Sequence, residues 1–368
     1  MSDLLYSDTE EALREGVRRL LADRCPPEKV AALYDAGTDD FSELWRTLAI
    51  DLGVAGLLVP EELGGAREAA VVCEEIGRAV APVPFLSSAV LATVALLGAG
   101  DTETVAALAA GEITAALLVP LSTAPGDRIG GVTAGADGLT GAVTSVAGAD
   151  TADVLVVPVS GPDGIELHTV SAGAAGVEVS PVLSLDMTRP IADVRFAGAP
   201  SSRAGSRPAD AAIAGALQTA TALLASEQLG VAQWCFDATL GYVKERKQFG
   251  RAIGSYQAIK HRVVEMWLQV GSAAAAARYA ADTCARGDAD ALIAAAVAAA
   301  YCGDAAVHVA EECVQLHGGI GMTWEYPAHL YLKRAKADQL AFGTGYRHRA
   351  RLAELVNLPV GPSEKEAQ

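Results

Sequence analysis

The sequence predicts a multidomain α+β fold, with a helical N-terminal domain, a middle β domain in the form of a barrel or sandwich, and a C-terminal helical bundle. Apolar residues recur every three or four positions up to about residue 111, and short runs separated by turn residues follow to about residue 208. Long helical patterns then resume. These two changes of pattern divide the chain into residues 1–111, 112–208 and 209–368.

The N-terminal domain has helical periodicity from Asp8 to about Gly111, clearest in EALREGVRRLLADR and FSELWRTLAIDLGVAGLLV. Pro26–Pro27 and the PEELGG turn at Pro60–Gly65 interrupt the pattern. We therefore expect several helices of moderate length with turns between them.

The middle domain begins near Ile113 with runs such as TAALLVPLS, LTGAVTSV, DVLVVPVS and ADVRFAG, and PSSRAGSRPAD at Pro200–Asp210 predicts a surface linker. Beyond it, alanine- and leucine-rich helical patterns run to about Leu355 and predict a four-helix bundle. The final GPSEKEAQ has no apolar anchor and is expected to be a disordered tail.

The composition excludes several classes of protein. A formal charge of −17 argues against a general binder of nucleic acid or of anionic membranes, since both need a basic face. The six cysteines lack CxxC spacing and no secretory leader is recognisable, so we expect reduced thiols and a cytoplasmic protein. The longest apolar run, Ala291–Cys302, is too short to span a bilayer, so we expect no transmembrane segment.

Two segments could carry chemistry. Tyr242–Gln257, YVKERKQFGRAIGSYQ, combines a basic helix end with a turn at Phe249–Gly250 and a second helix that starts near Ser255. Arg246 could hold a phosphate by a forked contact, although a solvated helix end is the commoner explanation of such a pattern. Gln315–Lys336 contains GGIG, a helix break that on its own more often marks a packing turn than a dinucleotide loop.

Together the two segments resemble the acyl-CoA dehydrogenase family, in which RxxFG and a following Gln precede QxxGGxG and a late Gly-Thr. The resemblance also covers PEELGG, SLDMTRPIADVRF at Ser184–Phe196 and FGTG at Phe342–Gly345. It implies FAD as cofactor, bound between the subunits of a dimer within a tetramer, with each site shared by two chains. The residues that a chain donates to its neighbour's FAD are all recognisable here: Arg246, Gln248, Phe249, Gln257, Gln315, Gly318 and Gly319.

The residues that hold the flavin ring and the thioester depart from the family pattern. The expected ring-binding loop is reduced to STAPGDR at Ser122–Arg128, the Trp-x-Thr contact is replaced within Ala142–Val146, and the Gln after Gly-Thr is Tyr346. The substrate-facing Asp and Arg of family members correspond to Gln218 and Thr221.

The catalytic base is also missing. Dehydrogenation of an acyl thioester requires a carboxylate to remove the Cα proton while the flavin accepts the β hydride. The two family positions for this glutamate hold Phe342 and Ala220, neither of which can accept a proton.

Three other carboxylates could be considered as a replacement base. Asp338 lies one helical turn before Phe342, but Arg334 at its i−4 position makes an ion pair the more common role. Glu227 lies two turns beyond Ala220, about 10 Å along the axis, and is too far unless the pocket is rebuilt. Glu325 could equally be a helix-entry or interface residue. His317 and His329 lack metal-ligand spacing, so no metal site is expected.

Three hypotheses follow. Random divergence should erode both halves of a shared site alike, so the one-sided loss favours one subunit of a hetero-oligomer containing two copies of each chain, in which a second acyl-CoA dehydrogenase subunit supplies the base. The family includes two-gene enzymes of this kind, some of which act on CoA thioesters of sterol side chains. A self-sufficient homotetramer that uses Asp338, and a flavin-free scaffold, remain as alternatives. The resemblance implies an acyl-CoA substrate and electron-transfer flavoprotein as acceptor, but not the identity of the acyl chain.

Overall fold

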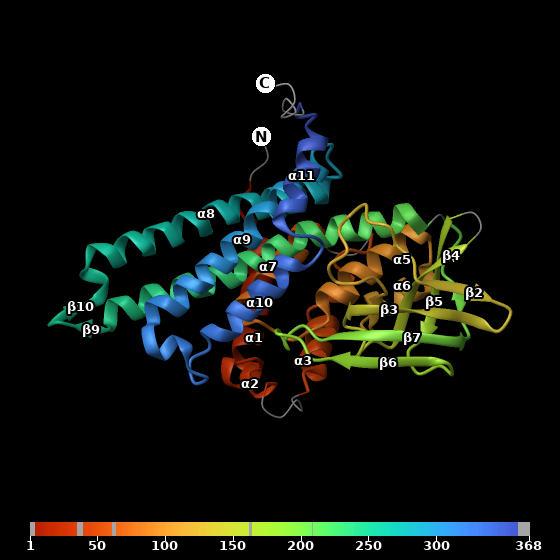
Figure 1. Cartoon of the computed structure of the whole chain (residues 1–368), viewed down its shortest axis with the longest axis horizontal. Helices are drawn as coiled ribbons and strands as arrows, with labels where there is room; N and C mark the ends of the chain where they lie inside the picture. Colours follow the sequence, from red (N-terminus) through yellow and green to blue (C-terminus); the bar gives the residue numbers. More distant parts are fainter. Residues whose placement is uncertain (1–3, 35–39, 61–63, 162–163, 208, 360–368) are drawn as a thin grey trace, which may run out of the picture.

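The computed structural model describes residues 4–34, 40–60, 64–161, 164–207 and 209–359. The expected tail at residues 361–368, the centre of the PEELGG turn at 61–63 and residue 208 of the linker lie outside these ranges. The β domain and the β9–β10 hairpin lie at opposite ends of an elongated molecule, with the helical bundle between them (Figure 1).

The N-terminal part is helical, as expected. Ser7 begins its first helix with a capping box, because the Ser7 side chain accepts from the Glu10 backbone N–H and the Glu10 carboxylate accepts from the Ser7 N–H. Its elements are α1 (Asp8–Arg24), α2 (Pro27–Ala32), α3 (Ser42–Arg46), η1 (Thr47–Asp51), η2 (Val54–Gly56), α4 (Ala66–Ala79), η3 (Phe85–Ala92), α5 (Thr93–Ala99) and α6 (Thr102–Ala109). Two of these, η1 and η3, are π-helical turns.

The β domain is one sheet with the order β6-β7-β3-β2-β4-β5-β8, and β1 pairs in parallel with β4. Its interior is a separate apolar cluster that includes Leu139, Leu155 and Phe196. The strands are β1 (Ala115–Leu117), β2 (Val132–Gly135), β3 (Gly138–Ala147), β4 (Val154–Gly161), β5 (Gly164–Ser171), β6 (Val177–Val182), β7 (Ile191–Ala199) and β8 (Ser202–Arg203).

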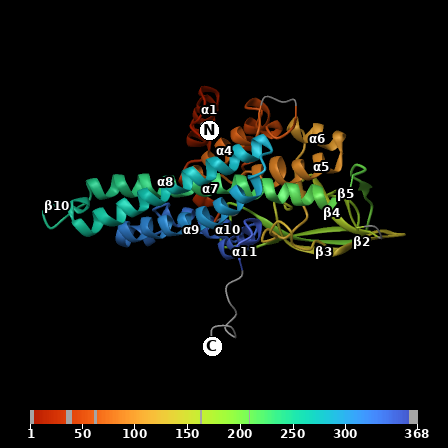
Figure 2. The ribbon, with the colours of Figure 1, turned by 90° about the horizontal axis from the view of Figure 1, so that it is seen from above.

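The C-terminal part is built around the long helix α7, with the N-terminal helices on one side and α9 to α11 on the other (Figure 2). The short strands β9 and β10 form the hairpin at the end of α7. The elements are α7 (Ala209–Glu245), β9 (Lys247–Gln248), β10 (Arg251–Ala252), η4 (Ile253–Ser255), α8 (Gln257–Arg286), α9 (Ala291–His317), η5 (Gly318–Met322), α10 (Ala328–Leu340) and α11 (Gly345–Leu355).

Helices α4 and α7 cross in direct backbone contact. A Cβ placed at Gly77 would lie 2.0 Å from the carbonyl oxygen of Glu227, and one placed at Gly230 would lie 1.9 Å from that of Glu74. Only glycine permits so close an approach at both positions. The two glycines therefore hold the N-terminal domain against the bundle.

Helix α9 continues into η5, and Ala291–Met322 is long and apolar enough to cross a membrane by length and composition alone. This helical stretch is longer than the apolar run Ala291–Cys302, from which we expected no transmembrane segment. However, 56% of its most apolar stretch is buried within the protein, and Cys302, Ala306 and Cys313 face the core. These observations are typical of the central helix of a bundle.

Candidate functional site

The sharp turn expected at Phe249–Gly250 is a two-residue β-hairpin between β9 and β10. Both residues have positive φ, 51° at Phe249 and 79° at Gly250, as in the mirror-image turns that join tightly paired strands. Phenylalanine rarely adopts this conformation, and its side chain is 93% exposed. A strained residue that presents an aromatic ring to solvent is typical of a binding surface.

The other positions of this segment lie beside the hairpin. Arg246, Gln248 and Gln257 are all exposed, and α8 begins at Gln257. The hydroxyl of Tyr256 donates to the backbone oxygen of Gln248 over 3.1 Å, which ties the hairpin to the start of α8. The Arg246 side chain makes no ion pair or hydrogen bond with the residues that the structure describes, so its guanidinium is open to an external anion.

The second motif meets the first through a contact between tilted rings. His317, at the end of α9, lies between Tyr242 of α7 and Tyr326, with both ring-centroid distances 4.3 Å. Gln315, Gly318 and Gly319 are exposed, and Gly318 breaks the helix at a φ of 63°. The ring contact between Tyr242 and His317 thus joins the two motifs that contain the seven predicted positions, Arg246, Gln248, Phe249, Gln257, Gln315, Gly318 and Gly319. We call this part of the bundle, which carries the β9–β10 hairpin (Figure 1), the donor end.

The donor end fits part of a dinucleotide cofactor. An unpartnered guanidinium suits a pyrophosphate, because arginine binds phosphate oxygens through charge-assisted, often bidentate, hydrogen bonds. The glycines at 318 and 319 leave open space, since a Cβ at either would meet no atom within 4 Å. A ligand can therefore approach this backbone closely.

The ring-side segments are those that the resemblance assigns to the flavin ring, namely Ser122–Arg128, Ala142–Val146 and Phe342–Gly345. They also come together, at the C-terminal end of α10. The backbone N–H of Leu121 donates to the oxygen of Ser145, and the N–H of Phe342 donates to the oxygen of Leu121. A Cβ at Gly343 would lie 2.9 Å from the Cβ of Ala124. Ser145 has a positive φ of 56° within an irregular stretch of the β3–β7 pairing.

A cavity of about 300 Å³ adjoins these segments and is lined by Leu121, Ser122, Ser145, Leu340 and Ala341, among others. It lies where the resemblance implies the flavin ring. With serine at position 145, this chain offers no broad aromatic face in the place of the Trp-x-Thr contact.

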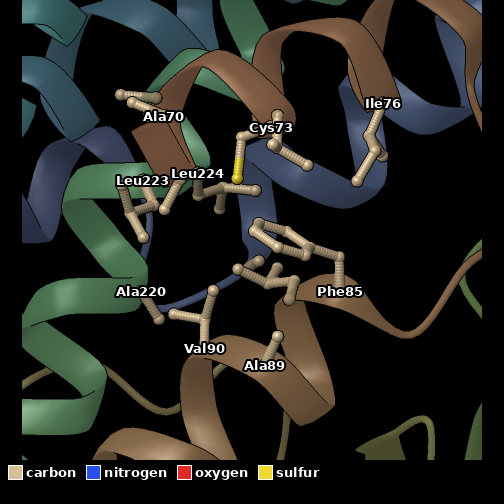
Figure 3. Packing of buried hydrophobic residues seen from close by; sticks show 14 of the residues in the cluster. Ala70, Cys73, Ile76, Phe85, Ala89, Val90, Ala220, Leu223 and Leu224 are labelled. Atoms are coloured by element: carbon tan, nitrogen blue, oxygen red, sulfur yellow. The ribbon is translucent and has the colours of Figure 1, made fainter. Parts of the chain in front are cut away.

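The two base positions are buried hydrophobic sites. Phe342 is 1% exposed, and Ala220 is fully buried beside Val90 in the apolar cluster that also contains Phe85 (Figure 3). The neighbouring face of α7 is also committed to packing, because Thr221 donates to Leu217 of its own helix and Gln218 to the oxygen of Ala291. Both base positions are therefore occupied by side chains of the core.

The expected helical relation between Asp338 and Phe342 is wrong. Helix α10 ends at Leu340, and Phe342 has a left-handed φ of 53° in the turn that follows. The two residues therefore do not share a helix face. Asp338 is instead buried inside a cluster of charged side chains.

This buried ion cluster contains two arginines and three carboxylates. Arg189 contacts Glu227 at 2.5 Å and Asp338 at 3.3 Å. Arg334 contacts Glu227 at 2.6 Å and Asp186 at 3.4 Å, and its i−4 partner Asp338 at 3.9 Å. The expected pairing of Asp338 with Arg334 is thus present within a larger network that joins the β domain to the bundle.

The cluster has three carboxyl groups but only two guanidinium groups. As a result, the pKa values of Glu227 and Asp338 differ widely. Burial alone would raise the pKa of Glu227, but Arg189 and Arg334 lower it to about 2. Burial and then the charge of Glu227 raise the pKa of Asp338 to about 8, and its Oδ2 has no hydrogen-bond partner among the residues that the structure describes. Near neutral pH, Asp338 is therefore mostly the uncharged acid.

Replacing Asp338 with asparagine is expected to remove a pH dependence of stability. The native pKa of about 8 exceeds the ordinary 3.8, so the stabilisation by this carboxyl is complete below pH 3.8 and is lost as the pH rises to about 8. The wild-type unfolding free energy minus that of Asp338→Asn should therefore decrease between about pH 4 and about pH 8. Urea denaturation at several pH values measures it, and a difference independent of pH would contradict the assignment.

The remaining sequence candidates are placed elsewhere. Glu325 is exposed, and hydrogen bonds from the backbone and Thr323 lower its pKa. His329 packs edge-on against Trp324, with ring centroids 4.6 Å apart. Among the described residues, no group of three or more His, Cys, Asp or Glu side chains could hold a metal ion. All six cysteines are free thiols.

Sequence reasoning missed Arg189 and Asp186 as members of the ion cluster. Both lie in SLDMTRPIADVRF, a segment noticed only for its resemblance. Their partners Glu227 and Arg334 are distant in sequence, so no local spacing could have revealed the network.

Comparison with known proteins agrees with the resemblance to the acyl-CoA dehydrogenase family. Sequence models of the acyl-CoA dehydrogenase N-terminal and C-terminal domains match residues 7–111 and 211–356. The chain is 34% identical over 342 residues to acyl-CoA dehydrogenase IpdE2 of Mycolicibacterium smegmatis, covering 92% of this chain and 95% of that protein.

Several solved structures are similar over nearly the whole chain, and two of them have 26% and 27% sequence identity to it. One is a variant of the Tcur3481-Tcur3483 steroid ACAD, with 27% identity and a TM-score of 0.82, covering 95% of this chain and 98% of that one. The other is the ChsE4-ChsE5 complex from Mycobacterium tuberculosis, with 26% identity and a TM-score of 0.83, covering 98% of this chain and 100% of that one.

Proposed function

Because the chain belongs to the acyl-CoA dehydrogenase family, whose cofactor is FAD, we propose that it is the subunit without the base in a hetero-oligomeric acyl-CoA dehydrogenase. In this role it donates half of an FAD site to a partner subunit that carries the catalytic carboxylate. The contrast between its two half-sites is the observation that supports this most.

The donor end has what a donated half-site needs. Arg246 is exposed without a partner among the described residues, and the ring contact between Tyr242 and His317 joins the two motifs. The base positions, by contrast, are filled by Phe342 and Ala220, which are nearly or fully buried. A chain that used its own site would need a proton acceptor and space for a thioester there.

The reaction is then divided between two chains. FAD, when bound, supplies the hydride acceptor for α,β-dehydrogenation of the acyl-CoA. Arg246 would bind and orient the cofactor through its pyrophosphate, and the exposed backbone at Gly318 and Gly319 would lie along its adenine half. The partner would remove the Cα proton and enclose the thioester.

An apolar strip on α8 supports association with a second chain. Val264, Trp267 and Leu268 lie within two turns and are 52%, 59% and 54% exposed. Helix α8 lies along an outer edge of the bundle (Figure 1). Large apolar side chains exposed together are typical of protein interfaces.

Two of the similar solved structures, the Tcur3481-Tcur3483 steroid ACAD and the ChsE4-ChsE5 complex, are named for two components. We therefore propose a bulky, steroid-derived acyl-CoA as the substrate class and electron-transfer flavoprotein as the acceptor. The six free cysteines suit the cytoplasm, which is the compartment that we propose.

The test is the flavin content of the chain purified alone and after co-expression with a partner acyl-CoA dehydrogenase that retains the glutamate before Gly-Thr. The first partner to try is one encoded beside this chain. Absorbance and native mass should show flavin only in the mixed complex, at one FAD per pair of chains. One flavin per lone subunit, together with acyl-CoA oxidation, would overturn the proposal.

The two alternatives give different results in this experiment. A self-sufficient enzyme that uses Asp338 would be yellow alone and would lose several orders of magnitude in turnover as Asp338→Asn. Asp338 is fully buried among ion partners and lines none of the described cavities, which disfavours this function. A flavin-free scaffold would stay colourless with every partner.

A further inference from the structure

A second cavity, of about 320 Å³, lies where the N-terminal helices meet the bundle, and its volume is within the range of small-molecule sites in proteins. Helices α1, α2 and α4 line one side, and α7 and α10 line the other. Its walls are largely apolar and include Leu21, Pro26, Pro27 and Ala79. Among the described residues, the lining includes none of the base positions or donor-end residues. The cavity is therefore separate from both half-sites.

The aromatic part of the lining is a stacked pair of rings. Trp234 in α7 and Tyr331 in α10 lie parallel, with ring centroids 3.6 Å apart and an angle of 4° between the planes. Tyr331 is buried, and its hydroxyl donates to the backbone oxygen of Arg78, which fixes this ring. Trp234 is only partly buried, so part of its indole can meet an occupant. An aromatic surface of this kind favours a flat, apolar ligand.

Two residues of the lining carry hydrogen-bond donors that are accessible and lack a partner. The Arg78 guanidinium contacts Asp237 through Nη2 at 2.9 Å, and its Nε and Nη1 have no partner among the described residues. The indole N–H of Trp234 likewise makes no hydrogen bond with the described residues. None of these three groups is fully buried, and the Arg78 side chain is 28% exposed. The donors are therefore open to an acceptor from outside the chain.

The described part of the lining offers no comparable acceptor side chain. Its carboxylate, Glu75, is 1% exposed and accepts from Nε and Nη2 of Arg18, at 2.8 and 2.6 Å. Its thiol, Cys25, is buried, and burial raises the pKa of this group to about 12, so the thiol stays uncharged. Arg18 and Glu75 neutralise each other. Arg78 therefore supplies the unbalanced charge of the lining, which favours an anion.

The anionic group that fits best is a carboxylate. A guanidinium binds carboxylate oxygens through charge-assisted, often bidentate, hydrogen bonds. Asp237 lies beside Arg78 and would repel a ligand that carries more than one negative charge, such as a phosphate, more strongly than a carboxylate.

We propose that this cavity binds a small, flat, aromatic carboxylic acid in its ionised form. The ring would lie on the accessible part of Trp234, among the apolar walls, and the carboxylate would accept from Arg78. Because the lining comes from the N-terminal helices and from the bundle, the ligand would contact both. The proposal does not depend on a shared FAD site or on an acyl-CoA substrate.

Calorimetric titration of the full chain with 2-naphthoate tests this proposal, and 2-naphthamide, which has the same shape without the charge, is the matched comparison. We expect naphthoate to bind about tenfold more tightly, because it makes a charge-assisted contact. Arg78→Gln should abolish this preference. Asp237→Asn removes the competing carboxylate, so it should tighten naphthoate by about threefold and leave naphthamide unchanged. A gain in affinity cannot arise from a loss of folding.

Two further variants complete the test. Ala22 is exposed and lines the cavity, so Ala22→Trp should fold normally and abolish binding by filling the space. Arg349→Gln removes an exposed arginine that already contacts Asp304, and this control should bind naphthoate normally. No binding of naphthoate, equal binding of naphthamide, weaker binding by Asp237→Asn, or unchanged binding by Ala22→Trp would overturn the proposal.

Discussion

Replacing Arg334 with methionine is expected to lower the free energy of unfolding by about 3 to 5 kcal/mol, the usual cost of removing one partner from a buried ion pair. Arg334 is 1% exposed and donates to Glu227, to Thr188 and to the backbone oxygen of Ala81. Without it, a single arginine, Arg189, would face the carboxylates of Glu227 and Asp186 and the mostly uncharged Asp338. Urea denaturation followed by circular dichroism measures the change.

The matched control is Arg349→Met. Arg349 is 55% exposed and contacts Asp304 at 3.3 Å, so the same chemical change should cost about 1 kcal/mol or less. Equal losses in the two variants would show that the ion cluster has no special role in stability. A partial recovery in the double variant Arg334→Met, Glu227→Leu would identify the unpaired carboxylate as the origin of the loss.

Replacing Arg246 with alanine is expected to raise the FAD dissociation constant of the assembled complex by about tenfold to a hundredfold. The variant lacks a charge-assisted contact worth about 1.5 to 3 kcal/mol. Because Arg246 is exposed at the end of α7 and makes no side-chain interaction among the described residues, folding should be unchanged. Flavin fluorescence, which rises as the cofactor dissociates, gives the constant directly.

Arg251→Ala is the control for this experiment, since it removes the same charge from the same hairpin. The Arg251 guanidinium lies 3.9 Å from the ring centroid of Tyr256 and is thus already engaged within the chain. We expect a change of about threefold or less. If both variants weaken FAD equally, general electrostatic attraction explains the effect, and if neither does, Arg246 does not bind the cofactor.

The donor end was largely predictable from sequence because its signals are local. The Phe249–Gly250 pair predicts a tight turn, and that turn is present with both residues at positive φ. The glycines after His317 predict a helix break, and α9 ends at His317. The second helix of the motif begins at Gln257, two residues beyond the expected Ser255. The assignment of these residues to FAD binding stays a prediction.

The packing around the two base positions and the buried ion cluster could not be predicted from sequence in the same way. Sequence shows that Phe342 and Ala220 are not bases. It does not show that Ala220 lies beside Val90, which belongs to another helix. It predicts an Arg334–Asp338 pair from i, i+4 spacing, but not Arg189, which lies 149 residues from Asp338. Such contacts depend on tertiary packing, which has no periodic signature in the chain.

The crossing of α4 and α7 at Gly77 and Gly230 has an evolutionary consequence. Any side chain at either position would force the two helices apart, so the domain boundary cannot drift without loss of the fold. A hydrophobic residue in place of a catalytic glutamate does not force helices apart, because the hydrophobic side chain packs in the core where the glutamate would be. A duplicated chain can therefore give up its chemistry while it keeps its architecture, which is a physical route from a self-sufficient enzyme to a specialised subunit.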